Sequence, residues 1–143
     1  MKLHFKTNYR WKESNLGEVA LEGRPALEVA PPPVFKGPEG MFSPEDFFVS
    51  AVETCFFLTL VFELKRANVK LLEYESKADG LLERVDGQMR FTQVDLYPKA
   101  VIEGDPEEMK ELMERAEKGC LVAHSISCPI HLHPEVTVAS PAT

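Results

Sequence analysis

The chain has 143 residues, of which 44% are hydrophobic and 27% charged, a composition that suits a single folded domain over 1–143. Its formal net charge of −7 argues against nucleic acid and anionic membranes as partners, because both carry negative charge. The three cysteines, Cys55, Cys120 and Cys128, follow an N-terminus without a signal-type apolar segment, which favours a reducing, cytoplasmic location.

The first thirty residues predict a small antiparallel sheet. Residues 2–11 alternate polar and apolar side chains, as a half-buried strand does. Residues 17–21 and 26–30 predict two more strands, and the segment between them has the glycine and proline of a turn. The three prolines 31–33 end this meander and open a loop.

A long helix is predicted to follow from Pro44 to about Ala67. Ser43 is a suitable cap, Pro44 suits the first helical position, and Glu45 and Asp46 place acids in the first turn. Apolar residues occur on every side of this helix, so we expect both flanks to be covered by sheet or by a second subunit. The charged residues in and around it favour a helix buried in protein over one that spans a membrane.

The second half predicts a hairpin and two helices. Residues 71–82 and 89–102 flank Asp86-Gly87, a pair typical of tight hairpin turns. A capped helix is predicted over 105–119, because Asp-Pro opens it and glycine ends it. A short helix over 121–126 follows directly.

The chain ends with a predicted strand over 130–138, in which Pro134 indicates a sheet edge or a bulge. Residues 139–143 are predicted to form a loose tail. The order is strands, long helix, strands, helices, strand, which indicates an α+β fold.

Two cysteines are candidates for chemistry. Cys55 lies in the middle of the apolar helix, where a thiol is either an inert core residue or, with a cation or donor beside it, a reactive thiolate. Cys120 follows the predicted helix end, where the free N–H groups of the next short helix would favour its thiolate; the alternative is again a core residue. Cys128 is expected to be a buried structural thiol.

Glu45 could be a simple partner of the helix dipole or part of a site. It precedes Cys55 by ten residues, about 15 Å along a straight helix, and cannot reach that thiol within its own chain. If it acts there, a partner subunit supplies it.

A metal site is the rival hypothesis for the C-terminal region. Cys120, His124 and Cys128 are spaced four residues apart, and zinc accepts such ligands. His131 and His133 point to one side of the final strand. However, the proline after Cys128 disfavours a continuous helix there, and the spacing matches no common zinc signature, so no metal is expected.

Four segments together resemble the OsmC/Ohr family, named for osmotically inducible and organic hydroperoxide resistance proteins. They are the glycine-containing loop 35–40, the helix start 43–48, the segment 51–55 that ends in Cys55, and 118–125 around Cys120. The resemblance implies antiparallel sheets wrapped around a long central helix, in an intertwined homodimer without a cofactor.

The resemblance also implies a reaction. Cys55 would attack an organic hydroperoxide, Cys120 would close a disulfide onto it, and Glu45 would belong to the active site. A dithiol reductant would restore both thiols, in defence against oxidative stress. The apolar helix around Cys55 would favour organic hydroperoxides over hydrogen peroxide.

One position departs from the family. An arginine that stabilises the thiolate is expected where this chain has Val34. Lys36, two residues on, and Arg24 and Arg10, on nearby predicted strands, are the candidate replacements, although lysine lacks the planar pair of donors that arginine offers. The departure leaves an alternative open, a non-catalytic protein that binds an apolar ligand.

Overall fold

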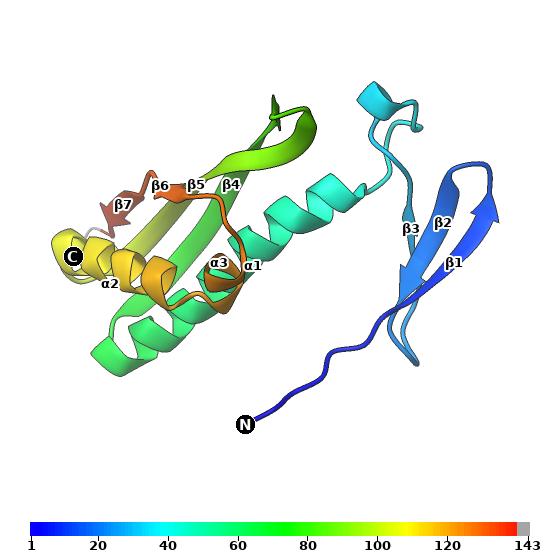
Figure 1. The fold of residues 1–143 in the computed structure, drawn as a ribbon. Coiled ribbons are helices and arrows are strands. Elements are labelled where there is room, and N and C mark those ends of the chain that lie inside the picture. The colour runs from blue at the N-terminus through cyan, green and yellow to red at the C-terminus, as the bar shows by residue number, and fades with distance from the viewer. Residues whose placement is uncertain (140–143) are drawn as a thin grey trace. The chain divides into compact units, whose positions relative to one another are not determined.

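The computed structural model describes residues 1–139 and is an α+β fold (Figure 1). The chain divides into two compact units, residues 1–48 and 49–143, and the division falls within the long helix α1. The prediction of one domain over 1–143 stays a prediction. The elements, in chain order, are β1 (Asn8–Glu13), β2 (Leu16–Ala20), β3 (Leu27–Val29), η1 (Pro33–Phe35), α1 (Pro44–Ala67), β4 (Lys70–Val85), β5 (Gln88–Glu103), α2 (Pro106–Gly119), α3 (Leu121–Ser125), β6 (Ile130–Leu132) and β7 (Glu135–Val138).

The first unit contains the predicted three-stranded antiparallel sheet, in the order β1-β2-β3. The prediction of a strand over 2–11 was wrong for residues 2–7. The ladder ends where Asn8 pairs with Ala20, and the chain then turns, so the earlier residues have no strand to pair with. β1 is also exposed along its whole length in the single chain, not half-buried as predicted.

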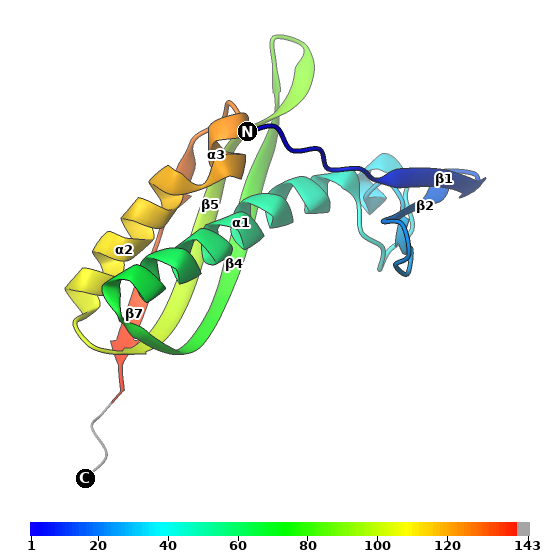
Figure 2. The same ribbon diagram turned by 90° about the horizontal axis from the view of Figure 1, so that it is seen from below.

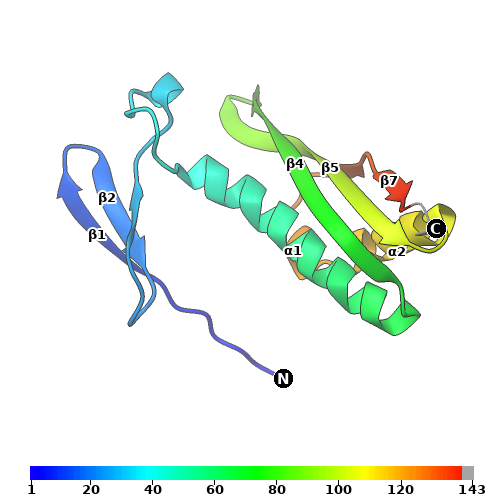
Figure 3. The ribbon, with the colours of Figure 1, turned by 180° about the vertical axis from the view of Figure 1, so that it is seen from behind.

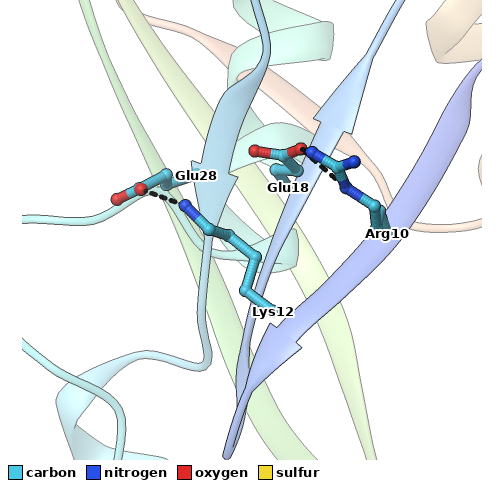
Figure 4. Close-up of polar contacts among 4 residues, drawn as sticks. All are labelled: Arg10, Lys12, Glu18 and Glu28. Atoms are coloured by element: carbon cyan, nitrogen blue, oxygen red, sulfur yellow. Dashed lines mark hydrogen bonds and ion pairs between the residues drawn. The ribbon is translucent and has the colours of Figure 1, made fainter.

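The two faces of this sheet differ in chemistry. One face carries ion pairs between strands, Arg10 to Glu18 at 2.5 Å and Lys12 to Glu28 at 2.9 Å (Figure 4). Because side chains alternate along a strand, Tyr9 and Trp11 lie on the opposite face, where they are 63% and 67% exposed.

Helix α1 begins and ends where the sequence predicts. Ser43 and Asp46 form a reciprocal cap: the Asp46 N–H donates to the Ser43 hydroxyl oxygen at 3.2 Å, and Asp46 Oδ2 accepts from the Ser43 N–H at 2.8 Å. At the other end Asn68 takes a left-handed φ of 55°, and the N–H of the following residue donates to the Leu64 carbonyl. These bonds satisfy backbone groups that a helix leaves free at its two ends.

The second unit is built on the hairpin β4–β5, longer than predicted. Asp86 and Gly87 have φ values of 50° and 81°, as a type I′ turn requires. The predicted strand 130–138 is two short strands, β6 and β7, both parallel to β5, with Pro134 between them. Proline has no N–H to donate to a ladder, which explains the break.

Two helices pack on one face of this sheet. α1 and α2 lie on the same side of β4 and β5, and the view from behind shows the strands in front of both helices (Figures 2 and 3). Every fourth residue of α1 from Val52 to Leu64 is buried, together with alternate residues of β5 and the apolar face of α2. Leu58 and Phe62 on α1 remain 63% and 58% exposed, so one flank of this helix is covered in the single chain and the other is not.

By length and composition alone, α1 could cross a membrane, since an 18-residue stretch has a mean hydropathy of 1.8. Its contacts are those of a helix on a sheet. Glu53 accepts a hydrogen bond from the Ser76 hydroxyl on β4 at 2.8 Å, and Phe57 packs against Tyr74 with ring centroids 4.3 Å apart. The prediction that no membrane is a partner stays a prediction.

The predicted tail over 139–143 lies outside the described residues except for Ala139, whose N–H donates to the Ile102 carbonyl at 3.0 Å.

Candidate active site

The thiols of Cys55 and Cys120 lie close enough for each to shift the pKa of the other, although 65 positions separate them in the chain. Cys55 lies in the middle of α1 and is half-buried, whereas Cys120 lies between α2 and α3 and is 1% exposed. Both are free thiols. The second unit therefore brings together the two cysteines that the sequence singled out.

The end of α2 places Cys120 beside Cys55. Cys120 has extended backbone angles, φ −69° and ψ 116°, so helix α2 stops there and α3 begins at Leu121. Gly119 lies against α1: a Cβ added to it would be 3.5 Å from Cγ2 of Thr59, an ordinary contact. Thr59 is one helical turn after Cys55, so this contact sets the end of α2 beside the thiol.

The Cys55 thiol has a pKa below its ordinary value. Burial is the largest single influence and raises the pKa. It is outweighed by hydrogen bonds to the sulfur from the Val122 N–H, the Cys120 thiol, the Thr59 hydroxyl and the Leu121 N–H. Hydrogen bonds to the charged form of a group favour that form, so Cys55 is biased toward the thiolate.

Cys120 behaves in the opposite way. Burial raises the pKa of its thiol; the N–H groups of Ala123 and Val122 act against this, while the neighbouring Cys55 raises it further. Those N–H groups act in the expected direction, in favour of a Cys120 thiolate, but burial and the neighbouring Cys55 outweigh them, and Cys120 is buried as the alternative expectation had it. The pair is therefore asymmetric: the pKa of Cys55 is lowered and that of Cys120 is raised.

Glu45 belongs to the first unit, where it lines a cavity of about 420 Å³. Its Oε2 atom is shielded from solvent and has no hydrogen-bond partner within residues 1–139. The other lining residues are mainly apolar: Tyr9, Asn15, Val29, Ala30, Pro31, Pro32, Phe35 and Pro44. A buried carboxylate oxygen in an apolar cavity is costly unless a donor or cation reaches it, so this cavity is suited to receive one.

The candidate cations Lys36 and Arg24 also belong to the first unit, and both are exposed. Lys36 closes the short helix η1 with a left-handed φ of 67°. Val34, at the position of the missing arginine, is 79% exposed in the same helix. A role for either cation beside Cys55 stays a prediction.

The residues of the rival metal hypothesis have other partners. Cys120 neighbours Cys55, His124 Nε2 lies 2.5 Å from the Lys118 carbonyl oxygen, and His133 Nε2 lies 2.8 Å from Asp95 Oδ1. In the described part of the chain, no three His, Cys, Asp or Glu side chains are gathered to hold a metal ion. Cys128 is buried, at 9% exposed.

Sequence reasoning missed three of the donors to the Cys55 sulfur. Two are backbone N–H groups, of Leu121 and Val122, and the third is the Thr59 hydroxyl. Thr59 carried a usable signal, because residues four apart share one face of a helix. The backbone donors carried none, since any residue could occupy their positions.

Comparison with known proteins places this geometry in context. A sequence family described as OsmC-like protein matches residues 37–135, more than half of the chain. The fold is similar to that of an OsmC-like protein of Vibrio cholerae, with a TM-score of 0.85 at 19% identity over 94% of this chain and 99% of the other. An organic hydroperoxide resistance protein of Elizabethkingia anophelis gives a TM-score of 0.72 at 22% identity over 97% and 100%. The protein YmaD of Bacillus subtilis is 19% identical over 140 residues, 94% of this chain and 93% of its own.

Proposed function

The chain belongs to the OsmC-like protein family, and we propose that within it this protein is a thiol-dependent peroxidase that reduces organic hydroperoxides to alcohols in the cytoplasm. The observation that carries the proposal is the neighbouring pair of thiols, Cys55 and Cys120, with the pKa of the first lowered and that of the second raised. Solved structures with the same fold include organic hydroperoxide resistance proteins.

The pair suits a two-step reduction. In the first step the Cys55 thiolate attacks the outer oxygen of the hydroperoxide; the O–O bond breaks, the alkoxide takes a proton and leaves as alcohol, and the sulfur becomes a sulfenic acid. In the second step the Cys120 sulfur attacks that sulfenic acid, and water leaves as the disulfide forms. A dithiol reductant then exchanges with this disulfide and restores both thiols.

The asymmetry of the two thiols matches these roles. The attacking sulfur must be ionised before the peroxide arrives, and the donors around Cys55 favour that state. The resolving sulfur must not compete for the peroxide, and a protonated, 1% exposed Cys120 is a poor competitor. Because the two thiols influence each other's pKa, they are neighbours, as formation of a disulfide requires.

We also propose that two copies of the chain form the working unit. Each copy exposes an aromatic sheet face with Tyr9 and Trp11 and an apolar helix flank with Leu58 and Phe62. In such a homodimer the Glu45 of one copy, with Lys36 or Arg24, would complete the site around the Cys55 of the other. This arrangement would give the buried Glu45 oxygen a partner and supply the cation that Val34 does not.

The test is turnover of cumene hydroperoxide with dithiothreitol as reductant. The wild type should consume the peroxide, Cys55→Ser should abolish turnover, and Cys120→Ser should give an enzyme that is inactivated by overoxidation. Cys128→Ser is the matched control and should keep full activity. Full turnover by Cys55→Ser, or equal loss in all three variants, would overturn the assignment.

The apolar cavity favours a second candidate, a protein that binds an apolar ligand without catalysis. About 420 Å³ is enough for a ligand of modest size, and the lining residues are mainly apolar. This alternative predicts binding of cumyl alcohol, the unreactive analogue of the peroxide, with no peroxide turnover. Turnover that depends on Cys55 would exclude it.

A further inference from the structure

We propose that His124 is a positioning residue: its imidazole ties the short helix α3 to the end of α2 and so holds Cys120 where it can close a disulfide onto Cys55. This inference rests on the proposed function and concerns its resolving step. It gives a role to a histidine that the sequence offered only as a candidate metal ligand.

The imidazole of His124 reaches across the junction between the two helices. Its Nε2 atom lies 2.5 Å from the carbonyl oxygen of Lys118. A carbonyl oxygen can only accept, so Nε2 carries the proton and donates it. Lys118 lies in the last turn of α2 and His124 lies in α3, so this bond joins the two helices on either side of Cys120.

The Lys118 carbonyl is a group that needs such a donor. The last four carbonyl groups of an α-helix have no N–H partner within the helix, and a histidine side chain can satisfy one of them. α2 ends at Gly119, and Cys120 leaves the helix with extended backbone angles. The backbone bond at this end, from the Cys120 N–H to the Glu117 carbonyl, is long at 3.4 Å. The His124 side chain therefore adds a shorter bond to a junction whose backbone bond is weak.

Helix α3 depends on contacts outside itself. It has five residues, Leu121–Ser125, whereas an isolated helix needs roughly 12–15 residues to be stable in water. Two bonds support its single turn, from the His124 N–H to the Cys120 carbonyl at 3.1 Å and from the Ser125 hydroxyl to the Leu121 carbonyl at 2.8 Å. Both bonds stay within residues 120–125, so neither of them ties α3 to α2, as the imidazole of His124 does.

Cys120 lies at this junction, beside the helix that carries Cys55. A Cβ added to Gly119 would be 3.5 Å from Cγ2 of Thr59, which lies one helical turn after Cys55. The rate and equilibrium of a reaction between two groups of one molecule depend on how narrowly the groups are held in place. Without the His124 bond, α3 would fray and the Cys120 sulfur would spend less time within bonding distance of the Cys55 sulfur.

The experiment measures the effective concentration of these two thiols toward each other. The full-length protein is equilibrated with mixtures of reduced and oxidised glutathione, and mass spectrometry quantifies the pair of peptides that the Cys55–Cys120 disulfide links. Oxidised glutathione takes two electrons and two protons from the protein thiols. The protein S–S bond forms, and the S–S bond of glutathione breaks to leave two glutathione thiols.

Three variants separate the donated bond from general stability. His124→Phe deletes the donor and keeps a ring, and we expect it to lower the effective concentration about threefold to tenfold, which corresponds to the loss of one hydrogen bond. His124→Gln places an amide N–H at about the reach of Nε2 and should stay within about twofold of the wild type. Asp105→Ala is the matched control, because it removes the cap at the other end of α2 and should leave the effective concentration unchanged.

A His124→Phe protein with the effective concentration of the wild type would overturn the inference. So would an equal fall in His124→Gln or in Asp105→Ala, because the cause would then be the shape of the ring or the stability of α2. If His124→Phe unfolds, as circular dichroism would show, His124→Leu takes its place under the same criteria.

The two proposals can fail separately. Exchange with glutathione needs no peroxide, so a lowered effective concentration in a protein without peroxide turnover would reject the peroxidase and keep the role of His124. Peroxide turnover that depends on Cys55, together with an unchanged effective concentration in His124→Phe, would reject the role of His124 alone.

Discussion

Gly80 on β4 lies so close to Val49 on α1 that a Cβ added to it would be 2.5 Å from Cγ2 of Val49. The ring of Phe91 on β5 would be 2.9 Å away. A glycine at this position allows the helix that carries Cys55 to approach the sheet, because any side chain there would have to displace its neighbours.

Gly80→Ala is therefore expected to destabilise the protein by about 1–3 kcal/mol, the usual cost of overpacking. The measurement is the midpoint and slope of urea unfolding. Gly119→Ala is the matched control, since its new Cβ would meet only Thr59 Cγ2 at 3.5 Å, and alanine is favoured over glycine in a helix. Equal stability of Gly80→Ala and the wild type would mean that α1 packs less closely than described.

The cap of α2 offers a second prediction. Asp105 Oδ1 accepts the Glu107 N–H at 3.0 Å at the start of the helix that ends beside Cys120. Asp105→Ala should lower the free energy of unfolding by about 0.5–2 kcal/mol, as the loss of an N-cap does. Asp105→Asn keeps an acceptor oxygen and should remain close to the wild type. Urea unfolding of the three proteins decides this, and an unchanged alanine variant would contradict it.

A third prediction concerns Tyr74, whose hydroxyl is buried without a hydrogen-bond partner of good geometry in the described part of the chain. Burial raises the pKa of Tyr74 to about 12. The nearby Ser76 hydroxyl donates its proton to Glu53 at 2.8 Å. Tyr74→Phe should leave stability unchanged or raise it by up to about 1 kcal/mol, because a desolvated polar atom is removed.

Thermal unfolding at pH 7 measures this effect, with Tyr97→Phe at a 46% exposed site as the control. A loss of more than about 1 kcal/mol in Tyr74→Phe alone would show that this hydroxyl has a partner in solution.

Features of the fold that depend on nearby residues were easier to predict than features that depend on packing. The ends of α1 were predicted correctly because their signals are local: a serine cap, a proline at the first position and acids in the first turn. The Asp86-Gly87 turn is local for the same reason. The prediction of a strand over residues 2–7 was wrong because a strand needs a partner strand, and the pairing of β1 with β2 ends at Asn8.

The site was less predictable than the fold. The meeting of Cys55 and Cys120 depends on where α2 ends against α1, and only the family resemblance anticipated it from the sequence. For Cys120 the sequence indicated the N–H groups that lower the pKa but could not show that burial outweighs them. Thr59 was missed although its spacing of four residues from Cys55 places both on one face of the helix.

A fourth prediction concerns pH. Asp95 on β5 accepts a hydrogen bond from His133, which lowers its pKa, and a second bond from Gln93 acts in the same direction. A carboxyl group whose pKa is lower in the folded state stabilises the fold above its unfolded pKa of about 3.9. That stabilisation is lost as the pH falls through the folded pKa.

His133→Phe removes the hydrogen bond and keeps a ring that can stack on Tyr97, as the imidazole does at 4.7 Å. The variant should have a lower melting temperature than the wild type at pH 5, and the gap should shrink as the pH falls toward 2. The Asp95 carboxyl resonance should titrate at higher pH in the variant. If the difference in melting temperature between the two proteins did not change with pH, the effect would be due to packing and not to the hydrogen bond with Asp95.

The last prediction tests the proposed dimer through the uncovered flank of α1. Leu58 and Phe62 lie one helical turn apart on that flank, and both are more than half exposed in the single chain. A contiguous apolar surface of this kind is usually covered by protein. We therefore expect the wild type to be a dimer by light scattering at micromolar concentration. Leu58→Lys should raise the dissociation constant of the dimer by about tenfold or more, because it would bury an unpaired charge. Val138→Lys, at a 42% exposed apolar site on β7, is the control and should remain dimeric.

If the dimer is needed to bring Glu45 to Cys55, Leu58→Lys should also lose peroxide turnover at low protein concentration and regain it as concentration rises. A monomeric wild type with full turnover would show that one chain suffices, and the buried Glu45 oxygen would then need a partner from its own unit.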